Sequence, residues 1–405
     1  MRRPVSPEAV SFGVTHSEVQ ETSMEKNSKK PTKRAEQAKV AAAQLSALQQ
    51  RADNSLVIGI DLGDRTSFYC VRTLDQEQVA TGTIAATVPA MTAFFQGIKR
   101  QRVVIETGTH SRWVAQLLDL LGQEVIVGNA RKLKLITPND QKGDRVDAGL
   151  LSKLGCVGVE WLYPVYRRSE GVQRTLTLVR AREALVETRT GLINQVRGQV
   201  KSFGCRISAC TAERFVEVAQ KELPEALCEA LGGVLEILEE LEDRLYRYDC
   251  QVKHACEQTY PQTKWLLQIA GVGPLTALTY VLTIEDPGRF ENSRDVGSYL
   301  GLVAKRRQSG KRDPQLGITK TGDEMLRKLL VNCAHHILGH VGADSDLRRW
   351  GLNLVARGQK AGQQGARKRA AAAVARKLAV VMHRLWVDER KYEPLRNSQT
   401  MAPAA

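Results

Sequence analysis

Short apolar segments separated by turn residues occupy the first part of the chain, after a polar start. The segments with strand character are Leu56–Leu62, Phe68–Leu74, Val79–Ile84, Arg102–Glu106 and Glu124–Val127. Helical patterns fall between or after them, near residues 90–100, 112–121 and 143–154. Three strands in succession followed by alternating helices and strands predict a mixed α/β sheet flanked by helices.

Long helical patterns replace this alternation from about residue 167 to residue 260. Apolar positions step by three or four residues, as in a coiled-coil seam, at Leu231, Leu235, Leu238, Leu241, Leu245, Tyr248 and Val252. An earlier stripe has the same spacing at Leu178, Ala181, Leu185, Thr188 and Leu192. Two such helices, joined through residues 203–224, predict an antiparallel helical hairpin that serves as a spacer or oligomerisation arm.

The patterns divide the chain into five segments. We expect a disordered basic arm over residues 1–54, which are too polar to bury a core. An α/β domain is expected over 55–160 and a helical coiled-coil hairpin over 161–262. A mostly α-helical domain over 263–392 and a tail over 393–405 complete the chain.

The net charge is strongly positive and unevenly distributed. The formal charge is +15, and residues 301–405 hold 21 Lys and Arg against 8 Asp and Glu. A basic surface of this kind attracts polyanions, because each neutralised phosphate releases counterions. Nucleic acid is therefore the expected partner.

Cysteine spacing and hydropathy exclude several classes of protein. The eight cysteines never form C-x-x-C, so a zinc ribbon or a dithiol redox motif is not encoded. The sequence contains no apolar run of the ~20 residues that cross a bilayer and no signal-peptide segment. We expect a cytoplasmic protein that works on DNA, without a membrane.

Four carboxylates form the main candidate site. Asp61 ends the first strand between Gly59 and Gly63, and Glu106 ends the fourth strand. Parallel neighbouring strands bring their carboxyl ends together. Asp144 and Asp147 are three residues apart, so a helix presents both on one face.

Such a cluster needs cations, and oxygen ligands suit Mg²⁺ or Mn²⁺. Two ions ~4 Å apart stabilise the attacking and leaving oxygens in phosphoryl transfer, which is nuclease chemistry. Two alternative interpretations, neither of which involves a nuclease site, stay open for these residues. A strand-terminal Asp before Leu62-Gly63 also begins sugar kinases and actin-like ATPases, and D-x-x-D on a helix is usually a solvated face.

The C-terminal region holds a turn and a serine in basic surroundings. Ile269–Pro274 joins two apolar segments in the manner of a helix-hairpin-helix, which can hold a DNA phosphate; an ordinary tight turn explains it equally well. Ser309 lies among cations, which favour a nucleophilic hydroxyl, although a serine in a basic loop is more often part of a turn. The cations we expect to contact nucleic acid are Lys305, Arg306, Arg307, Lys311, Arg312, Lys320, Arg327, Arg376 and Lys377.

Six motifs in order resemble the DEDD transposases of bacterial insertion sequences, a family related to the Piv DNA invertase and containing bridge-RNA-guided recombinases. The N-terminal motifs are Gly59-Ile60-Asp61, Ile105-Glu106-Thr107-Gly108 and Lys142-Gly143-Asp144-Arg145-Val146-Asp147-Ala148. The C-terminal motifs are Gly301-Leu302, Gln308-Ser309-Gly310 and Gly317-Ile318-Thr319-Lys320-Thr321-Gly322. The likeness covers residues 56–390. Ala304 departs from the family's usual proline at that position.

The resemblance implies a RuvC-like, RNase H-type fold over residues 55–160. It implies that Asp61, Glu106, Asp144 and Asp147 bind Mg²⁺ while Ser309 attacks a phosphodiester and forms a phosphoserine link to DNA. It also implies a homodimer or homotetramer and a guide (bridge) RNA. Alternatives are a RuvC-like junction resolvase or nuclease that uses water, an ATPase, and an inactive DNA- or RNA-binding protein; an ATPase would need a second Asp-Gly phosphate loop, which is not evident.

Overall fold

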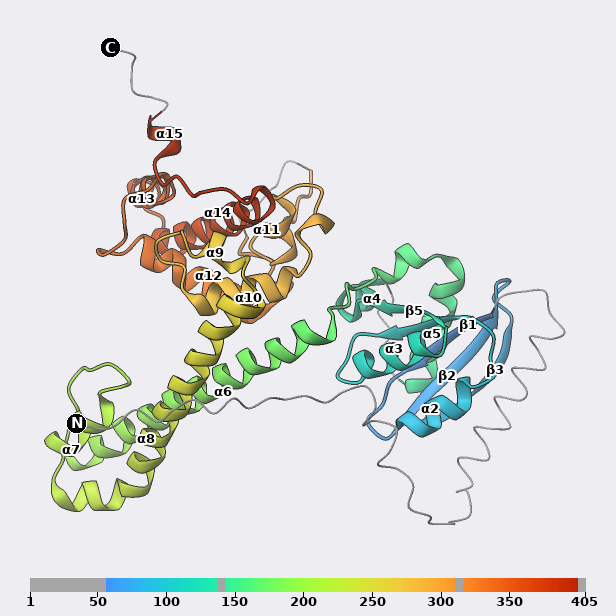
Figure 1. Ribbon diagram of the computed structural model, residues 1–405, viewed down its shortest axis with the longest axis horizontal. Coiled ribbons are helices and arrows are strands. Elements are labelled where there is room, and N and C mark those ends of the chain that lie inside the picture. Colours follow the sequence, from blue (N-terminus) through green and yellow to red (C-terminus); the bar gives the residue numbers. More distant parts are fainter. Residues whose placement is uncertain (1–55, 137–142, 311–315, 400–405) are drawn as a thin grey trace. The chain divides into compact units, whose positions relative to one another are not determined.

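The computed structural model describes residues 56–136, 143–310 and 316–399, and the chain separates into two compact units between Arg167 and Arg168 (Figure 1). The expected arm over 1–54 lies outside the described residues, as do Lys311, Arg312 and the last six residues. None of the helices within the described ranges is long and apolar enough to cross a membrane.

The first unit is built on a five-stranded sheet of order β3-β2-β1-β4-β5. Its strands are β1 (Leu56–Asp61), β2 (Thr66–Thr73), β3 (Gln78–Ala85), β4 (Arg102–Glu106) and β5 (Glu124–Gly128). β1, β2 and β3 pair antiparallel as a meander, whereas β1, β4 and β5 run parallel. The mixed α/β sheet predicted from the sequence is confirmed.

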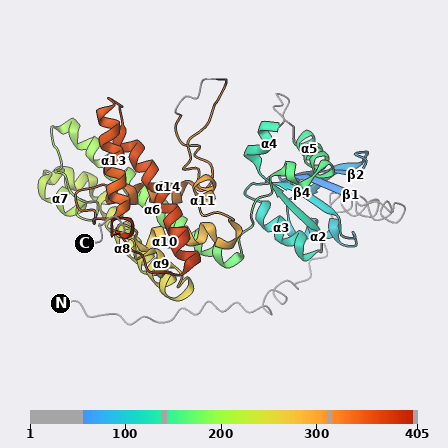
Figure 2. The same cartoon turned by 90° about the horizontal axis from the view of Figure 1, so that it is seen from above.

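Helices cover both faces of this sheet (Figure 2). The alternation of side chains along a strand sends Leu56, Ile58 and Ile60 of β1 into a core with α2 (Val88–Phe95) and α3 (Ser111–Leu120). On the opposite face Val57 packs with residues of α4 (Ala130–Ile136) and α5 (Asp144–Val157). α2 ends earlier than predicted because Gly97 adopts a left-handed φ of 87°.

The second unit is entirely helical in its regular elements, within the described residues. Two helices of 30 residues each, α6 (Glu170–Gln199) and α8 (Glu225–His254), flank the shorter α7 (Phe215–Glu222). The remaining described α-helices are α9 (Thr263–Leu266), α10 (Pro274–Ile284), α11 (Asp295–Tyr299), α12 (Glu324–Ile337), α13 (Asp346–Lys360), α14 (Ala366–Asp388) and α15 (Arg396–Gln399). The helical C-terminal region predicted from the sequence is confirmed. α10 and α14 form much of its core, which includes Tyr280, Leu282, Val374, Leu378 and Met382.

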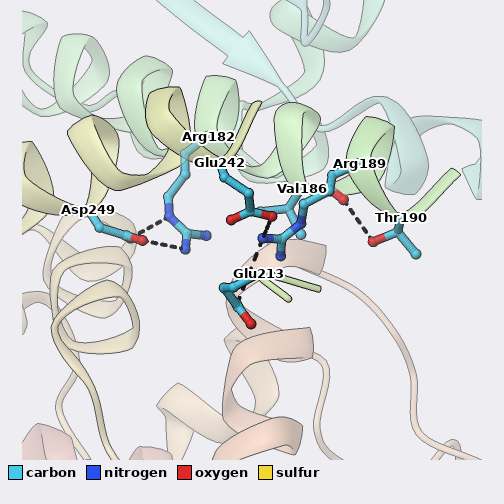
Figure 3. Close-up of polar contacts among 7 residues, drawn as sticks. All are labelled: Arg182, Val186, Arg189, Thr190, Glu213, Glu242 and Asp249. Carbon is cyan, nitrogen blue, oxygen red and sulfur yellow. Dashed lines mark hydrogen bonds and ion pairs between the residues drawn. The ribbon is translucent and has the colours of Figure 1, made fainter. Parts of the chain in front are cut away.

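Half-buried ion pairs join α6 to α8 (Figure 3). Arg182 binds Asp249 through two N–H···O contacts of 2.7 and 3.2 Å, and Arg189 donates to Glu242 at 2.7 Å. The pairing of 182 with 249 and of 189 with 242 shows that the helices run antiparallel. The Arg189 side chain is only 14% exposed, so its charge depends on its carboxylate partner.

Replacing Arg189 by leucine is expected to lower the free energy of unfolding by about 2 kcal/mol, since Glu242 is then left partly buried without its cation. The matched control is Arg174→Leu, which breaks the exposed pair with Glu170 and is expected to cost less than about 0.5 kcal/mol. Urea unfolding followed by circular dichroism measures both. Equal losses of unfolding free energy in the two variants would mean that the Arg189–Glu242 pair contributes no more to stability than an exposed ion pair does.

The turn at residues 267–273 packs against the helical core rather than presenting a free helix-hairpin-helix. Gly271 has a φ of 95°, and a Cβ there would lie 2.9 Å from the His336 side chain on α12. The preceding helix α9 is only four residues long. These observations support the tight-turn alternative for this segment.

Candidate active site

Asp61 and Glu106 end two neighbouring parallel strands at the same edge of the sheet. Ile60 of β1 pairs with Ile105 of β4, so the next residue on each strand is Asp61 and Glu106. Successive residues of a strand alternate between faces, so Asp61 shares a face with Gly59 and Val57. Glu106 likewise shares that face with Val104, which packs beside α5. Both carboxylates therefore lie on the side covered by α5.

α5 brings the other two carboxylates to this edge. Its first turn contains Asp144 and Asp147. Its backbone lies directly on β1, because a Cβ at Gly59 would be 2.3 Å from both the Ala148 carbonyl oxygen and the Ser152 nitrogen. Further along α5, a Cβ at Gly155 would lie 2.7 Å from Val57 and Val104. The C-terminal end of α5 therefore lies over the start of β1, and the N-terminal end of α5, with Asp144 and Asp147, lies toward Asp61.

Gly59→Ala is expected to lower the free energy of unfolding by about 3 kcal/mol, because the methyl group overlaps two backbone atoms that cannot rotate away. The matched control is Gly149→Ala on α5, where a Cβ meets nothing within 4 Å; removing a helical glycine there is expected to stabilise by about 0.5 kcal/mol. Thermal unfolding measures both. A Gly59→Ala protein as stable as the wild type would contradict the close approach of α5 to β1.

The electrostatics of Asp61 reflect this convergence. The pKa of its carboxyl group is raised from 3.8 to about 6, chiefly by burial and then by the negative charges of Asp147, Asp144 and Glu106, in that order. The three neighbours act as negative charges on one half-buried group. An acidic cluster of this kind is unfavourable at neutral pH without a cation.

The donor set fits a hard divalent cation by its chemistry, since all four side chains offer carboxylate oxygens. Within the described ranges, however, no group of three or more His, Cys, Asp or Glu side chains is already arranged to hold a metal ion. Asp144 is exposed, and Asp61, Glu106 and Asp147 are partly exposed. Binding therefore requires these side chains to turn toward one another from positions that the strands and α5 fix.

Ser309 lies in the second unit, on a ribbon made of residues 301–310 and 316–322, whose two segments pair with each other. Lys305 N–H donates to the Gly317 carbonyl, Thr319 N–H to Val303 and Lys320 N–H to Gly301, each at 2.9 to 3.1 Å. Ala304 and Ile318 form an antiparallel bridge, so the departure from proline at residue 304 leaves this pairing in place. Ser309 itself is exposed.

The base of this ribbon is closely packed against the helical core. Gly301 has a φ of 67°, and a Cβ there would lie 2.2 Å from the Thr321 carbonyl oxygen. Gly322 has a φ of 76°, and its Cβ would lie 2.1 Å from the Tyr299 carbonyl oxygen. Residues 317–322 are therefore held in place by close contacts with their neighbours.

Arg327 corrects a prediction. The sequence placed it among the nucleic-acid contacts, but it is only 8% exposed. Its guanidinium donates to the carbonyl oxygens of Leu300, Thr321 and Asp323, at 3.2, 2.7 and 3.3 Å. Burial and these contacts of Nη1 with carbonyls at both ends of the ribbon indicate that Arg327 holds the two ends together rather than contacting a phosphate.

The other described cations of the predicted set lie at the surface. Lys305, Arg306, Arg307 and Lys320 are exposed on the ribbon. Arg376 and Lys377 are exposed on α14, and the Lys377 ammonium lies 4.4 Å from the centre of the Trp350 ring. Sequence reasoning missed Trp350 and Arg294, which line one groove together with Arg376 and Lys377. In the sequence they are only an arginine and a tryptophan far apart in the chain, so no local pattern links them.

Comparison with known proteins assigns the two regions that carry these candidates. Residues 263–347 match the model described as the IS116/IS110/IS902 family of transposases, and residues 58–204 match the DEDD transposase model of the IS110 type. A putative transposase of Sinorhizobium fredii, y4pF/y4sB, is 30% identical over 325 residues, which are 75% of this chain and 77% of that protein. The chain belongs to this transposase family.

Two further relatives of the transposase agree with this assignment. The transposase for insertion sequence element IS1111A of Coxiella burnetii is 31% identical over 231 residues, or 54% of this chain and 60% of that protein. The transposase for IS1328 of Yersinia enterocolitica is 29% identical over 302 residues, or 69% of this chain and 83% of that protein. The four carboxylates fall within the 58–204 match, and Ser309 falls within the 263–347 match.

Proposed function

We propose that this transposase cuts and rejoins insertion-sequence DNA with Asp61, Glu106, Asp144 and Asp147 as ligands of Mg²⁺ or Mn²⁺ and with Ser309 as the nucleophile. The observation that supports the metal site is the convergence of the four carboxylates, from two neighbouring strand ends and the first turn of α5, at one edge of the sheet. The pKa of Asp61, raised to about 6 by burial and by its three acidic neighbours, agrees with it. The order Asp, Glu, Asp, Asp along the chain also agrees with the matching DEDD family. We further propose that the sheet has the RuvC-like, RNase H-type fold.

The residues of the second unit supply attack and binding in this proposal. The Ser309 Oγ bonds to phosphorus, and the bond from phosphorus to the leaving DNA oxygen breaks; the serine proton ends on that oxygen. Lys305, Arg306 and Arg307 attract the phosphate to the ribbon. Attack by a hydroxyl of another DNA end reverses the step and releases Ser309.

The carboxylates position the reaction from the first unit. When bound, a divalent cation there supplies electrostatic stabilisation of charge on the phosphate oxygens. Asp61 and Glu106 are fixed by strand ends, while Asp144 and Asp147 are carried by one helix turn. The serine and the carboxylates that serve one phosphodiester belong either to one chain or to different chains of a homodimer or homotetramer.

Target choice and location complete the proposal. A guide (bridge) RNA that selects the target suits a protein whose basic residues contact phosphates and whose sequence has no evident base-reading motif. Such an enzyme acts in the bacterial cytoplasm, on DNA of the nucleoid. The DNA partners are double-stranded, namely the element ends and the target.

The test incubates full-length protein and Mg²⁺ with DNA labelled at an element end, with and without RNA from the element's flanks. We expect a protein–DNA adduct that survives denaturation and whose modified peptide contains Ser309. Reactions in EDTA are the control and are expected to give no adduct. Metal-dependent cleavage that leaves only free DNA ends would instead establish a hydrolytic RuvC-like nuclease or junction resolvase that uses water.

A further inference from the structure

A groove of about 1040 Å³ lies beside the Ser309 ribbon in the second unit. α14 and α13 form two of its sides, and the ribbon contributes Ala304 and Ile318. The residues that line it divide into two chemical types. One type is cationic and the other is apolar, and among the residues that the structure describes no Asp or Glu lines the groove.

The cations of the groove carry uncompensated charge. They are Arg294, Lys368, Arg369, Arg376, Lys377 and Arg384, and all six are exposed. Within the described part of the chain none of them forms an ion pair, whereas Arg349 on α13, outside the groove, binds Asp344. Six like charges around one groove repel one another, so a polyanion is the ligand that balances them.

Along α14 the two chemical types alternate. Lys368 and Arg369 are followed by two alanines, then by Arg376 and Lys377, then by two valines, and then by Arg384. The steps between cationic positions are seven or eight residues, or about 11 to 12 Å at the rise of an α-helix. Each cationic position can bind a phosphate, and the gaps between them expose apolar surface.

The floor of the groove favours unpaired bases. Trp350, Leu354 and Ile318 line it, and the Trp350 ring carries the Lys377 ammonium on its face. Aromatic and aliphatic side chains stabilise bases by stacking only when those bases are not already stacked inside a duplex. A duplex would present its phosphates to the cations but would leave the apolar floor unused.

We propose that this groove binds an unpaired strand of DNA, with phosphates on the α14 cations and bases against Trp350 and its apolar neighbours. Because Ala304 and Ile318 of the ribbon form part of the groove, the bound strand is the one that leads to Ser309. This last step rests on the proposed function. The binding of an unpaired strand in the groove is inferred from the charge and shape of the groove alone.

The test measures binding of fluorescent twelve-nucleotide oligo(dT), a matched duplex and oligo(U) to full-length protein in EDTA, where no chemistry occurs. The double variant Arg376→Gln/Arg384→Gln is expected to bind oligo(dT) at least about 10-fold more weakly. Its salt dependence should fall by about 1.4 in slope, for two lost phosphate contacts. The charge-matched control, Arg357→Gln/Lys360→Gln, removes two exposed cations of α13 outside the groove and is expected to bind as the wild type does.

Trp350→Phe gives an independent readout of base stacking. We expect oligo(dT) to quench the fluorescence of the wild type, and this part of the quenching to disappear in the variant. The proposal would be overturned if the control pair weakened oligo(dT) binding as much as Arg376→Gln/Arg384→Gln does. It would also be overturned if the double variant lost only duplex binding, or if oligo(U) bound more tightly than oligo(dT) through the same residues. Because no adduct is measured, failure here leaves the Ser309 chemistry standing, and absence of a Ser309 adduct leaves the groove standing.

Discussion

Ser309→Ala is expected to eliminate the covalent protein–DNA adduct and to lower strand joining on the order of 10³-fold or more, because the variant lacks the only oxygen that the proposed mechanism uses for attack. The fold should be unaffected. Ser309 is exposed on a ribbon whose packing is concentrated at its base, where Arg327 and two glycines hold the ends. Adduct gels and strand-transfer assays with labelled element ends measure the effect, and thermal unfolding checks the fold.

The matched control is Ser298→Ala on α11, another exposed serine of the same unit, which is expected to keep full activity. DNA binding by Ser309→Ala should stay within about 2-fold of the wild type, since the neighbouring cations are retained. An adduct that persists in the Ser309→Ala protein would assign the attack to a different side chain. Cleavage that continues without any adduct would assign it to water.

Local patterns were sufficient to predict the carboxylate edge of the sheet. Strand alternation and the apolar content of residues 56–62 and 102–106 predicted two neighbouring strands, and their parallel pairing is confirmed. The three-residue spacing of Asp144 and Asp147 predicted one helix face, and α5 begins at Asp144. These predictions succeeded because each depends on backbone periodicity within a few residues.

Contacts between distant segments were not predictable in the same way. Arg327 looked like a phosphate contact because cations surround it in sequence, yet its burial depends on carbonyls of Leu300 and Thr321 that the fold brings to it. The stripe predicted on α6 included Thr188, which is exposed; its hydroxyl donates to the Ala184 carbonyl, while Val179 and Val196 are buried. Ser309 was chosen as nucleophile through family resemblance, since a serine in a basic loop has no distinctive local pattern.

Asp61 is a partly buried carboxylate among other carboxylates, so its substitution is expected to have the second large effect on activity and stability. Asp61→Asn is expected to lower strand transfer about 10³-fold, because a neutral amide replaces a proposed metal ligand. In EDTA the same variant should be more stable than the wild type at pH 7.5, by about 1 to 2 kcal/mol after allowance for the partly exposed position of the group. Opposite effects on activity and stability distinguish a functional carboxylate from a structural one.

The stability difference between Asp61→Asn and the wild type depends on pH, because folding raises the pKa of Asp61. The pKa of Asp61 is 3.8 in the unfolded chain and about 6 in the folded protein. Between these values the folded state keeps a proton that the unfolded state has released, so each rise in pH favours unfolding. The destabilisation of the wild type by the Asp61 charge is therefore absent below pH 3.8, grows between pH 3.8 and pH 6, and is complete above pH 6.

Thermal unfolding in EDTA at a series of pH values measures the difference between Asp61→Asn and the wild type. It should vanish near pH 4 and reach its full size by pH 7.5. Asp75→Asn, at an exposed turn between β2 and β3, is the control and should match the wild type throughout. A variant less stable than the wild type at pH 7.5 would mean that the Asp61 carboxylate supports the fold rather than opposing it, and the case for a cation at this edge would lose its main support.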